Sequence, residues 1–273
     1  MVLDTEHKNR EKLKQINYES TRPTDFADIS AISGSKMLNP FEYLSSAEQN
    51  ISLTDLSEAI IFWTQEQIGI DEIIQARQEF FTLTGRIFPD DYFYHQRISY
   101  FLDFFTFQRP IQGKLRENDQ ANTPFKQFVC SPYFNSQNIS EALQKKFYDL
   151  ANFRHSLFKV SKVKKNCLIL KDLFANEKIE ISDPHKKVLF QGLPPGSVYQ
   201  GFIFKIDEKI CLSQGLLLHP PSVSSFITRT VNKLKKNPPF NQMKFLAQLA
   251  KLNLNYIRHS KKDAKKIYVL PAE

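Results

Sequence analysis

The stretch Leu157-Phe158-Lys159-Val160-Ser161-Lys162-Val163 sets the fold, because apolar and polar residues alternate along most of it. Successive side chains of an extended chain point to opposite faces, so this alternation predicts a half-buried β-strand. Four more short apolar runs follow, at residues 167–173, 178–181, 198–206 and 209–218. Asp207-Glu208 fits a two-residue hairpin loop. Together these runs predict a small five-stranded antiparallel β-barrel domain over residues 156–219.

The sequence on both sides of this region has helical periodicity. In residues 51–155, apolar side chains recur every three or four positions, as at Ile98 and Phe105. Residues 220–273 continue the pattern in two segments that Pro238-Pro239 separates, since proline ends a helix. We therefore expect an α+β protein with a helical N-terminal half, the barrel, and two basic C-terminal helices.

The first 50 residues differ from the rest of the chain. They are mostly polar and lack periodicity, so we expect residues 1–50 to be largely disordered or loosely docked. Residues 37–44 are an exception, because they include Met37, Leu38, Phe41 and Leu44. This short apolar element is expected to dock on the folded body.

Local signals place several helix ends in the N-terminal half. Gly85 suits a helix C-terminus, since glycine adopts positive φ without strain. Thr123-Pro124 predicts a helix start with proline in the first turn. Pro89 with Asp90-Asp91 predicts another start, at which the two carboxylates cap free N–H groups and complement the positive helix end. Arg109-Pro110 is expected to end that helix.

Composition narrows the class of protein. The chain has 273 residues, of which 41% are hydrophobic and 24% charged, and this balance is that of an ordinary globular protein. Three Cys are too few for a disulfide scaffold, and no apolar run is long enough to span a membrane. The first residues lack a secretory pattern. We expect a cytoplasmic protein with reduced thiols.

The net charge of +8 is concentrated at one end of the chain. Residues 220–273 hold 11 Lys and Arg against two acids, Asp263 and Glu273, whereas the remainder holds 26 against 27. Such asymmetry indicates an anionic partner for the C-terminal segment: nucleic acid, an acidic protein or a membrane surface. The alternative is a solvated helix face that improves solubility.

Spacing within this segment identifies candidate binding residues. Lys244, Lys251 and Arg258 are separated by seven positions, which on a helix puts them nearly in line and roughly 10 Å apart. A row of cations at this spacing can follow the phosphates of a nucleic acid. The candidate residues for an anionic partner are Lys233, Lys236, Lys244, Lys251, Arg258, Lys262 and Lys265. The leading interpretation is a non-enzymatic binding or adaptor protein.

The aromatic content suggests a second interpretation. Residues 80–134 contain eleven Phe and four Tyr. Most occupy the apolar positions of expected helices, so core packing is the simplest use. An exposed remainder would form an aromatic groove for another protein, and the alternative function is therefore a protein–protein interaction module.

An enzyme of unknown class is the third interpretation, because no catalytic pattern is complete. Cys130, Cys167 and Cys211 are too far apart for a usual zinc site, so we expect no metal and no other cofactor. Glycine-rich phosphate loops are absent. Ser33-Gly34-Ser35-Lys36 fits an S-x-x-K pattern but lacks its K-T-G partner. We assign no catalytic residue.

Several short motifs occur in an order that resembles a known group. They are Phe101-Leu102-Asp103-Phe104-Phe105, Thr123-Pro124-Phe125, Leu157-Phe158-Lys159-Val160, Leu170-Lys171-Asp172-Leu173, and Gly215 before His219-Pro220-Pro221. This resembles an uncharacterised bacterial protein family, over roughly residues 70–225, that pairs a helical half with a small β-barrel module containing a strand ending in Asp-Leu. Some members are similar to proteins with a Cys-rich zinc-binding tail of the SEC-C type. Residues 220–273 contain no Cys, so the resemblance implies the architecture without the zinc site.

Overall fold

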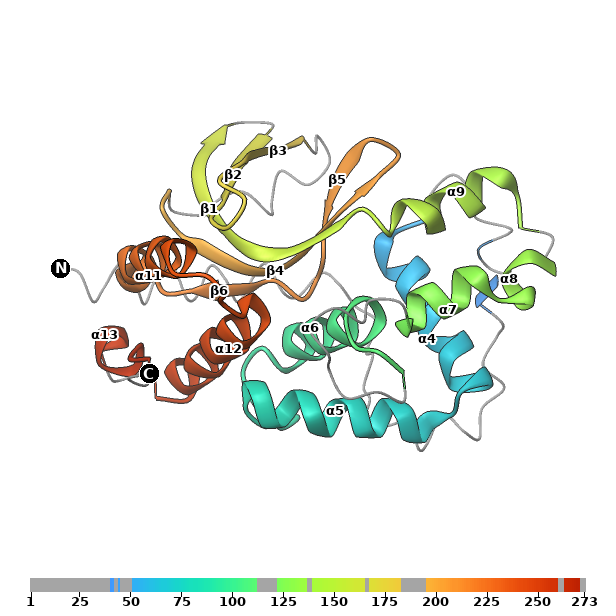
Figure 1. The fold of residues 1–273 in the computed structure, drawn as a ribbon, viewed down its shortest axis with the longest axis horizontal. Coiled ribbons are helices and arrows are strands. Elements are labelled where there is room, and N and C mark those ends of the chain that lie inside the picture. Colours follow the sequence, from blue (N-terminus) through green and yellow to red (C-terminus); the bar gives the residue numbers. More distant parts are fainter. Residues whose placement is uncertain are drawn as a thin grey trace.

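The α+β architecture is confirmed by a computed structural model of the chain. It describes residues 40, 41, 44, 51–111, 122–136, 139–164, 167–182, 195–259 and 263–270. A helical part packs at one end of a curled antiparallel sheet, and C-terminal helices pack at the other end (Figure 1). No helix in the described ranges combines the length and apolarity needed to cross a membrane.

Between residues 51 and 155, the described residues of the helical half form six helices. They are α4 (Leu53–Gln67), α5 (Ile70–Thr84), α6 (Tyr94–Phe107), α7 (Pro124–Cys130), α8 (Pro132–Ser136) and α9 (Glu141–Asp149). The predicted end of α5 at Gly85 is confirmed, with φ of 92°. Thr123 begins α7 as expected, because its side chain accepts a hydrogen bond from the Lys126 amide at 3.4 Å.

The predicted role of Asp90-Asp91 at a helix start is wrong. Helix α6 begins later, at Tyr94, and is preceded by Phe93 with φ of 67°. The Asp91 carboxylate instead accepts a hydrogen bond from the Phe88 amide at 2.8 Å, within the turn before the helix. Asp91 therefore organises a loop, and neither carboxylate caps the helix.

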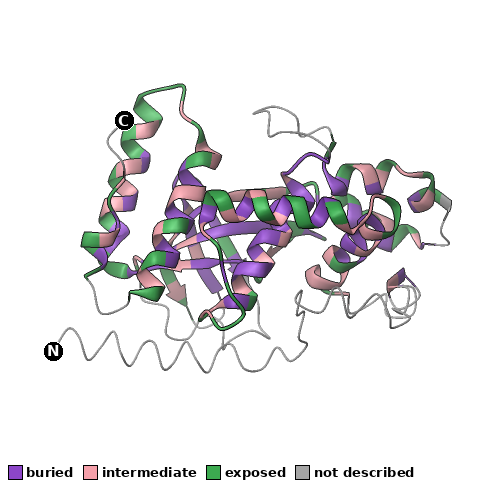
Figure 2. Cartoon of the chain, turned by 90° about the horizontal axis from the view of Figure 1, so that it is seen from below, coloured by how far each residue is buried: buried purple, intermediate pink, exposed green. Residues whose placement is uncertain are grey.

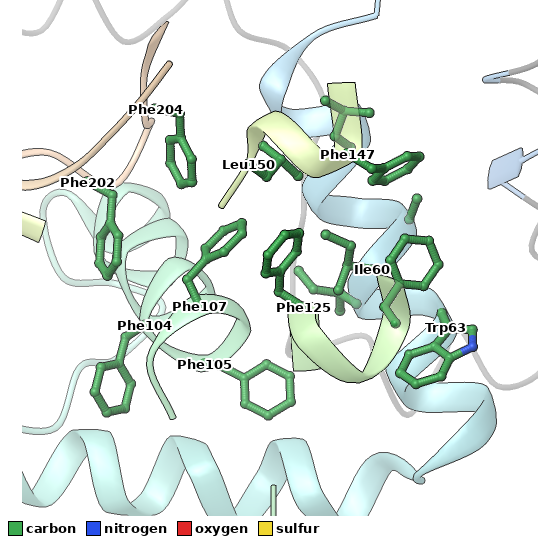
Figure 3. Close-up of a cluster of buried hydrophobic side chains, with 14 of the residues drawn as sticks. Ile60, Trp63, Phe104, Phe105, Phe107, Phe125, Phe147, Leu150, Phe202 and Phe204 are labelled. Atoms are coloured by element: carbon green, nitrogen blue, oxygen red, sulfur yellow. The ribbon is translucent and has the colours of Figure 1, made fainter. Parts of the chain in front are cut away.

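Aromatic side chains fill the core of the helical half (Figure 3). Phe128 is fully buried, and its ring centroid lies 5.1 Å from that of Phe147 and 5.6 Å from that of Trp63. Phe107 on α6 contacts Phe204 of the sheet at 4.9 Å between centroids. The same hydrophobic cluster thus joins the helices to the sheet, and the aromatic content of residues 80–134 is used mainly for packing.

Part of the N-terminal expectation lies within the described residues. Phe41 and Leu44 are buried in the same core, and the Phe41 ring lies 5.7 Å from that of Phe128. The docking predicted for residues 37–44 is confirmed for these two side chains. The other expectations for residues 1–50, including Ser33-Gly34-Ser35-Lys36, lie outside the described residues.

The sheet curls into a half-barrel. Its strands are β1 (Phe153–Lys164), β2 (Cys167–Asp172), β3 (Lys178–Ser182), β4 (Val198–Ile206), β5 (Lys209–Leu212) and β6 (Leu217–His219). The order is β3-β2-β1-β4-β5, all antiparallel, and β6 pairs with β4. A bulge between Val160 and Lys162 bends the long strand β1. The last strand predicted from the sequence, residues 209–218, is therefore two strands.

Gly215 explains the interruption between β5 and β6. A Cβ atom at this position would lie 2.5 Å from the backbone N and Cα of Tyr100, so the two segments approach more closely than any side chain allows. Next to this contact the Ser213 hydroxyl hydrogen-bonds the buried Asp103 carboxyl group. The chain leaves β5 at this point to pack against α6.

Asp172 closes the end of β2. Its Oδ1 accepts hydrogen bonds from the Ser156 hydroxyl at 2.6 Å and from the amides of Phe174 and Ala175 at 2.9 and 3.1 Å. A buried carboxylate that receives three donors holds the turn between β2 and β3 in place. The Asp-Leu at the end of this strand therefore has a structural use.

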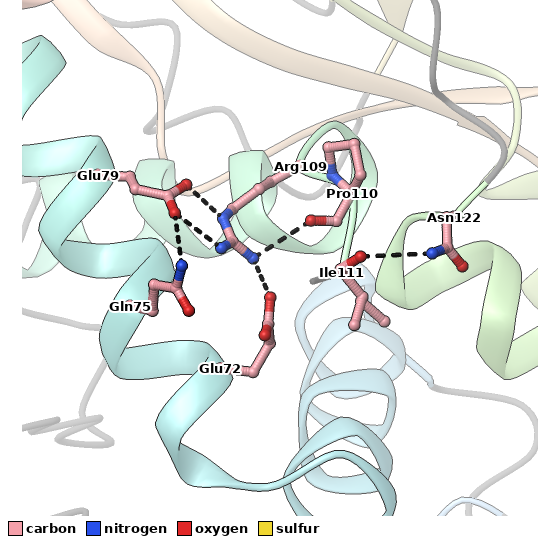
Figure 4. Close-up of polar contacts among 7 residues, drawn as sticks. All are labelled: Glu72, Gln75, Glu79, Arg109, Pro110, Ile111 and Asn122. Carbon is pink, nitrogen blue, oxygen red and sulfur yellow. Dashed lines mark hydrogen bonds and ion pairs between the residues drawn. The ribbon is translucent and has the colours of Figure 1, made fainter. Parts of the chain in front are cut away.

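Arg109 links the end of α6 to α5 (Figure 4). The side chain is fully buried, and its Nε donates to Glu79 Oε2 at 2.8 Å, while Nη1 pairs with Glu72 and also reaches the Pro110 carbonyl. The hydrogen bonds from Arg109 lower the pKa of Glu79. A buried charge is satisfied here by partners from a second helix.

The C-terminal helices cover one part of the sheet. They are the short helix η3 (Pro221–Val223), α11 (Ser224–Lys236), α12 (Gln242–Arg258) and α13 (Ala264–Ile267). Ile227 and Val231 of α11 pack with Leu157 and Val198 of the sheet, whereas α12 lies between the sheet and α5. Their buried residues face inward and their exposed residues outward (Figure 2).

Candidate nucleic-acid interface

The predicted basic residues lie on the surface of the C-terminal helices. We call the described lysines among them, all of which are exposed, the C-terminal basic face: Lys233, Lys236, Lys244, Lys251 and Lys265. They come from the last turn of α11, from α12 and from α13. Lys262 lies outside the described residues.

Arg258 differs from the expectation of a free, outward charge. Its Nε donates to Asp91 Oδ1 at 3.0 Å, and its Nη2 donates to the Arg86 carbonyl at 2.7 Å. The guanidinium also lies over the ring of Phe88, 5.3 Å from the centroid. Asp91 raises the pKa of Arg258, and Arg258 lowers the pKa of Asp91. Arg258 therefore fixes the end of α12 to the loop before α6.

The predicted row along α12 is consequently divided. Lys251 lies beside α5, since its Cγ is 3.8 Å from the position of a Cβ at Gly85. Lys244 is in the first turn, where its amide donates to the Asn241 side chain at 2.7 Å. Arg258 is neutralised within the chain. The free charge of α12 is thus at its N-terminal end and middle.

A second group of cations, which the sequence interpretation missed, lies on the sheet. Lys159 of β1 pairs with Lys171 of β2, and Lys171 pairs with Lys178 of β3. Residues directly opposite each other in neighbouring strands project from the same face, so these three form a lysine ladder across the sheet. On its other side Lys159 pairs with the buried Val198, which packs under α11.

Only part of this ladder could be found from the sequence. The alternation around Leu157 and Val160 places Lys159 on the opposite face from Val160. The pairing of β1 with β2 and β3 sets which lysines stand opposite one another, and pairing is not encoded locally. The balanced charge of residues 1–219 also hides a basic region within them.

A chain of buried hydrogen bonds lies where the helical half, the sheet and α12 meet. Each member is a polar side chain that donates to the next, at 2.6–3.4 Å between heavy atoms. From the first donor to the last acceptor the chain comprises Arg97, Asn253, Tyr268, His219, Gln200, Tyr100, His155 and Gln108. Its groups come from all three parts of the fold.

The direction of this chain fixes the protonation of both histidines. The side-chain oxygen of Gln200 only accepts, so His219 Nε2 carries the hydrogen and Nδ1 accepts from the Tyr268 hydroxyl. His155 likewise donates from Nδ1 to Gln108 and accepts at Nε2 from Tyr100. A second proton on either ring would meet a donor.

Burial acts in the same direction as the hydrogen bonds. It lowers the pKa of His155 and of His219 to about 3, and the Arg97 charge contributes at His219. Burial also lowers the pKa of Arg97 to about 10. Because each imidazole donor and acceptor is used within the chain, neither ring is offered to a substrate as a general base. The chain connects the parts of the fold.

Asp103 is the remaining buried acid of interest. Burial raises its pKa to about 7, and the hydrogen bond from Ser213 acts in the opposite direction. The Ser213 hydroxyl also accepts from the Gly215 amide at 2.8 Å. Among the described residues, no other titratable side chain hydrogen-bonds Asp103 or Ser213, so they lack the further group that a nucleophile and its base require.

Neither a search for metal-binding clusters nor comparison with known proteins identifies a further site. Among the described residues, no three His, Cys, Asp or Glu side chains gather as a metal site. No family model, no curated protein and no solved structure matches the chain. The resemblance to the bacterial family related to SEC-C-associated proteins therefore stays a prediction.

Proposed function

We propose that the chain is a non-enzymatic binding protein whose C-terminal basic face binds an anionic partner, and that this partner is nucleic acid. The observation that carries the proposal is the set of exposed lysines on α11, α12 and α13, in a segment with two acids in its sequence. One of these acids, Asp263, accepts from the Lys265 amide at 3.0 Å at the start of α13. A positive surface of this kind attracts phosphates.

The position of Lys244 supports a use beyond helix stability. Cations stabilise the last turn of a helix and are unfavourable in the first turn, because of the helix dipole. Lys233 and Lys236 are in a last turn, but Lys244 is in the first turn of α12, which has no acidic residue. Its charge does not serve the helix, so a bound anion is the better account of it.

The two alternatives have less support. The aromatic residues of the helical half that suggested a protein-binding groove are mostly buried. Within the described part of residues 80–134, the exposed aromatic side chains are Phe88 and Tyr92. His219 is buried and His155 is half-buried, and both ring nitrogens of each are hydrogen-bonded within the chain. Binding through charge is the function that the geometry supports best.

Fluorescence anisotropy with a labelled 20-nucleotide strand tests the proposal. We expect the wild type to bind at low salt and to lose affinity steeply as the salt concentration rises. The helix variant, with Lys233→Gln, Lys244→Gln and Lys251→Gln, should bind at least about tenfold more weakly at the same low salt concentration. Equal binding by the wild type and this variant would refute the proposal.

A charge-matched control separates local from general electrostatics. Arg77→Gln, Lys126→Gln and Lys146→Gln remove three cations from α5, α7 and α9 of the helical half. This control variant has the same net charge as the helix variant and should bind like the wild type. An equal loss in both variants would mean that net charge alone, and not the C-terminal basic face, governs binding.

A further inference from the structure

The lysine ladder belongs to a larger basic surface on the sheet. Beyond the bulge, Lys162 pairs with Ile169 and Lys164 pairs with Cys167. Cys167, Ile169 and Lys171 are two positions apart along β2, so they project from the same face of the sheet. Lys162 and Lys164 therefore share the face of the ladder. We call this surface the sheet lysine face: Lys159, Lys162, Lys164, Lys171 and Lys178. Among the paired residues of this face, the acidic one is Glu180 of β3, which lies opposite Ile169.

These lysines are not neutralised by ion pairs with other described residues. No ion pair in the described part of the structure includes any of the five. The neighbouring Glu177 is paired with Arg154. Like charges directly opposite each other destabilise a sheet, so the ladder of three lysines has a cost that a bound anion would relieve.

The sheet lysine face adjoins the C-terminal basic face. Along the ladder, exposure rises from Val198, which is buried under α11, through the half-buried Lys159 and Lys171 to the exposed Lys178. From the other side, Lys235 in the last turn of α11 donates to the Leu173 carbonyl at 3.4 Å. Leu173 lies two residues beyond Lys171, so the end of α11 and the ladder are neighbours.

The chemistry of this face fits a phosphodiester backbone. All five cations are lysines, which contact phosphate as flexible point charges and do not form the bidentate fork with which arginine binds a carboxylate or a phosphate. Strands lie about 4.8 Å apart, so the ladder presents charge at short, regular intervals that suit a regular polyanion. On the lysine face of β2, Ile169 is half-buried and Cys167 is buried, which leaves little apolar surface to insert into a membrane.

We propose that the sheet lysine face binds the backbone of nucleic acid without reading its sequence, and that it forms one interface with the C-terminal basic face. This inference rests on the proposed function and adds a binding site to it. It predicts that a bound nucleic-acid strand runs from α11 across β1, β2 and β3. Lysine contacts to phosphate position the strand, and no base-reading group is required.

The test uses a sheet variant of the full chain with Lys159→Gln, Lys171→Gln and Lys178→Gln. Anisotropy is measured with single-stranded RNA, single-stranded DNA and duplex DNA of 20 nucleotides, whose comparison identifies the form of the phosphodiester that is preferred. We expect affinity to fall by about tenfold or more for the preferred form, with the control variant unchanged. Trp63 fluorescence and circular dichroism report whether the variant is folded.

The outcomes separate this inference from the proposed function. If the helix variant loses binding and the folded sheet variant binds like the wild type, the sheet site is overturned and the proposed function stands. If neither variant differs from the wild type, both fail. If the triple variant does not fold, Lys178→Glu replaces it, because Lys178 is exposed, and unchanged binding by this variant overturns the sheet site.

Other polyanions supply the last arm of the test. Binding to phosphatidylserine vesicles and, separately, to a polyglutamate peptide is measured for the wild type, the sheet variant and the control variant. Binding to either that is tighter than to every oligonucleotide, and that falls in the sheet variant, would overturn nucleic acid as the occupant. Weak, equal binding of these two probes by the wild type and the sheet variant supports it.

Discussion

His219 makes the stability of the protein depend on pH in a way that one substitution isolates. The ring is fully buried and is held neutral between Gln200 and Tyr268, with Arg97 nearby. In the unfolded chain the same ring takes up a proton near pH 6.5, whereas in the folded protein its pKa is about 3. The contribution of His219 to the free energy of unfolding is therefore fully present above pH 6.5 and is lost as the pH falls below that value.

The size of the effect follows from this linkage. Between pH 7 and pH 5 the unfolded ring becomes protonated and the folded ring does not, which lowers the free energy of unfolding by about 2 kcal/mol. Asp103 acts in the opposite direction, because its folded pKa is about 7 against an ordinary value of 3.8. Its contribution rises by about 2 kcal/mol over the same interval, which offsets a loss of similar size at His155, whose folded pKa is also about 3.

His219→Gln is the variant that separates these contributions. It keeps a neutral polar group, so its free energy of unfolding should rise relative to the wild type by about 2 kcal/mol on going from pH 7 to pH 5. Urea unfolding, followed by the fluorescence of the single and buried Trp63, measures this at both pH values. The same pH dependence in both proteins would refute the neutral, buried histidine. NMR of the wild-type ring, which should not titrate above pH 5, checks it independently.

Three further predictions concern stability and use urea unfolding at pH 7. Gly215→Ala should destabilise the protein by about 3 kcal/mol or more, since the added methyl group meets the Tyr100 backbone; a loss below 1 kcal/mol would contradict the packing. Arg109→Met should cost about 3–5 kcal/mol by leaving Glu72 buried and unpaired, and adding Glu72→Gln should recover part of it. Lys171→Gln should stabilise by about 0.5 kcal/mol at low salt, because it relieves the lysine ladder, and a loss of stability would argue against that repulsion.

Local patterns in the sequence predict the elements of this fold well. The alternation from Leu157 to Val163 is the centre of β1, and Thr123-Pro124 begins α7. Such signals depend on neighbours in the chain, so they are visible without the structure. The same is true of the exposed lysines of α11 and α12, whose helical positions follow from spacing.

Features that depend on distant residues were not predictable. Asp91 resembles a helix cap in the sequence, yet its partner is Arg258, 167 positions away. The strand break at Gly215 depends on the backbone of α6, and the lysine ladder depends on the register of three strands. Each of these required the tertiary arrangement, which also converted one proposed binding residue, Arg258, into a structural contact.

The dependence of binding on salt tests the central claim most directly, because it reports how many phosphates the protein neutralises. For a single strand, the slope of the logarithm of the binding constant against that of the salt concentration is about −0.7 for each phosphate contacted. We predict a steep wild-type slope, which becomes shallower by about 4 when the helix and sheet substitutions are combined and six lysines are removed. A wild-type slope near zero, or one that the combined variant leaves unchanged, would contradict the account.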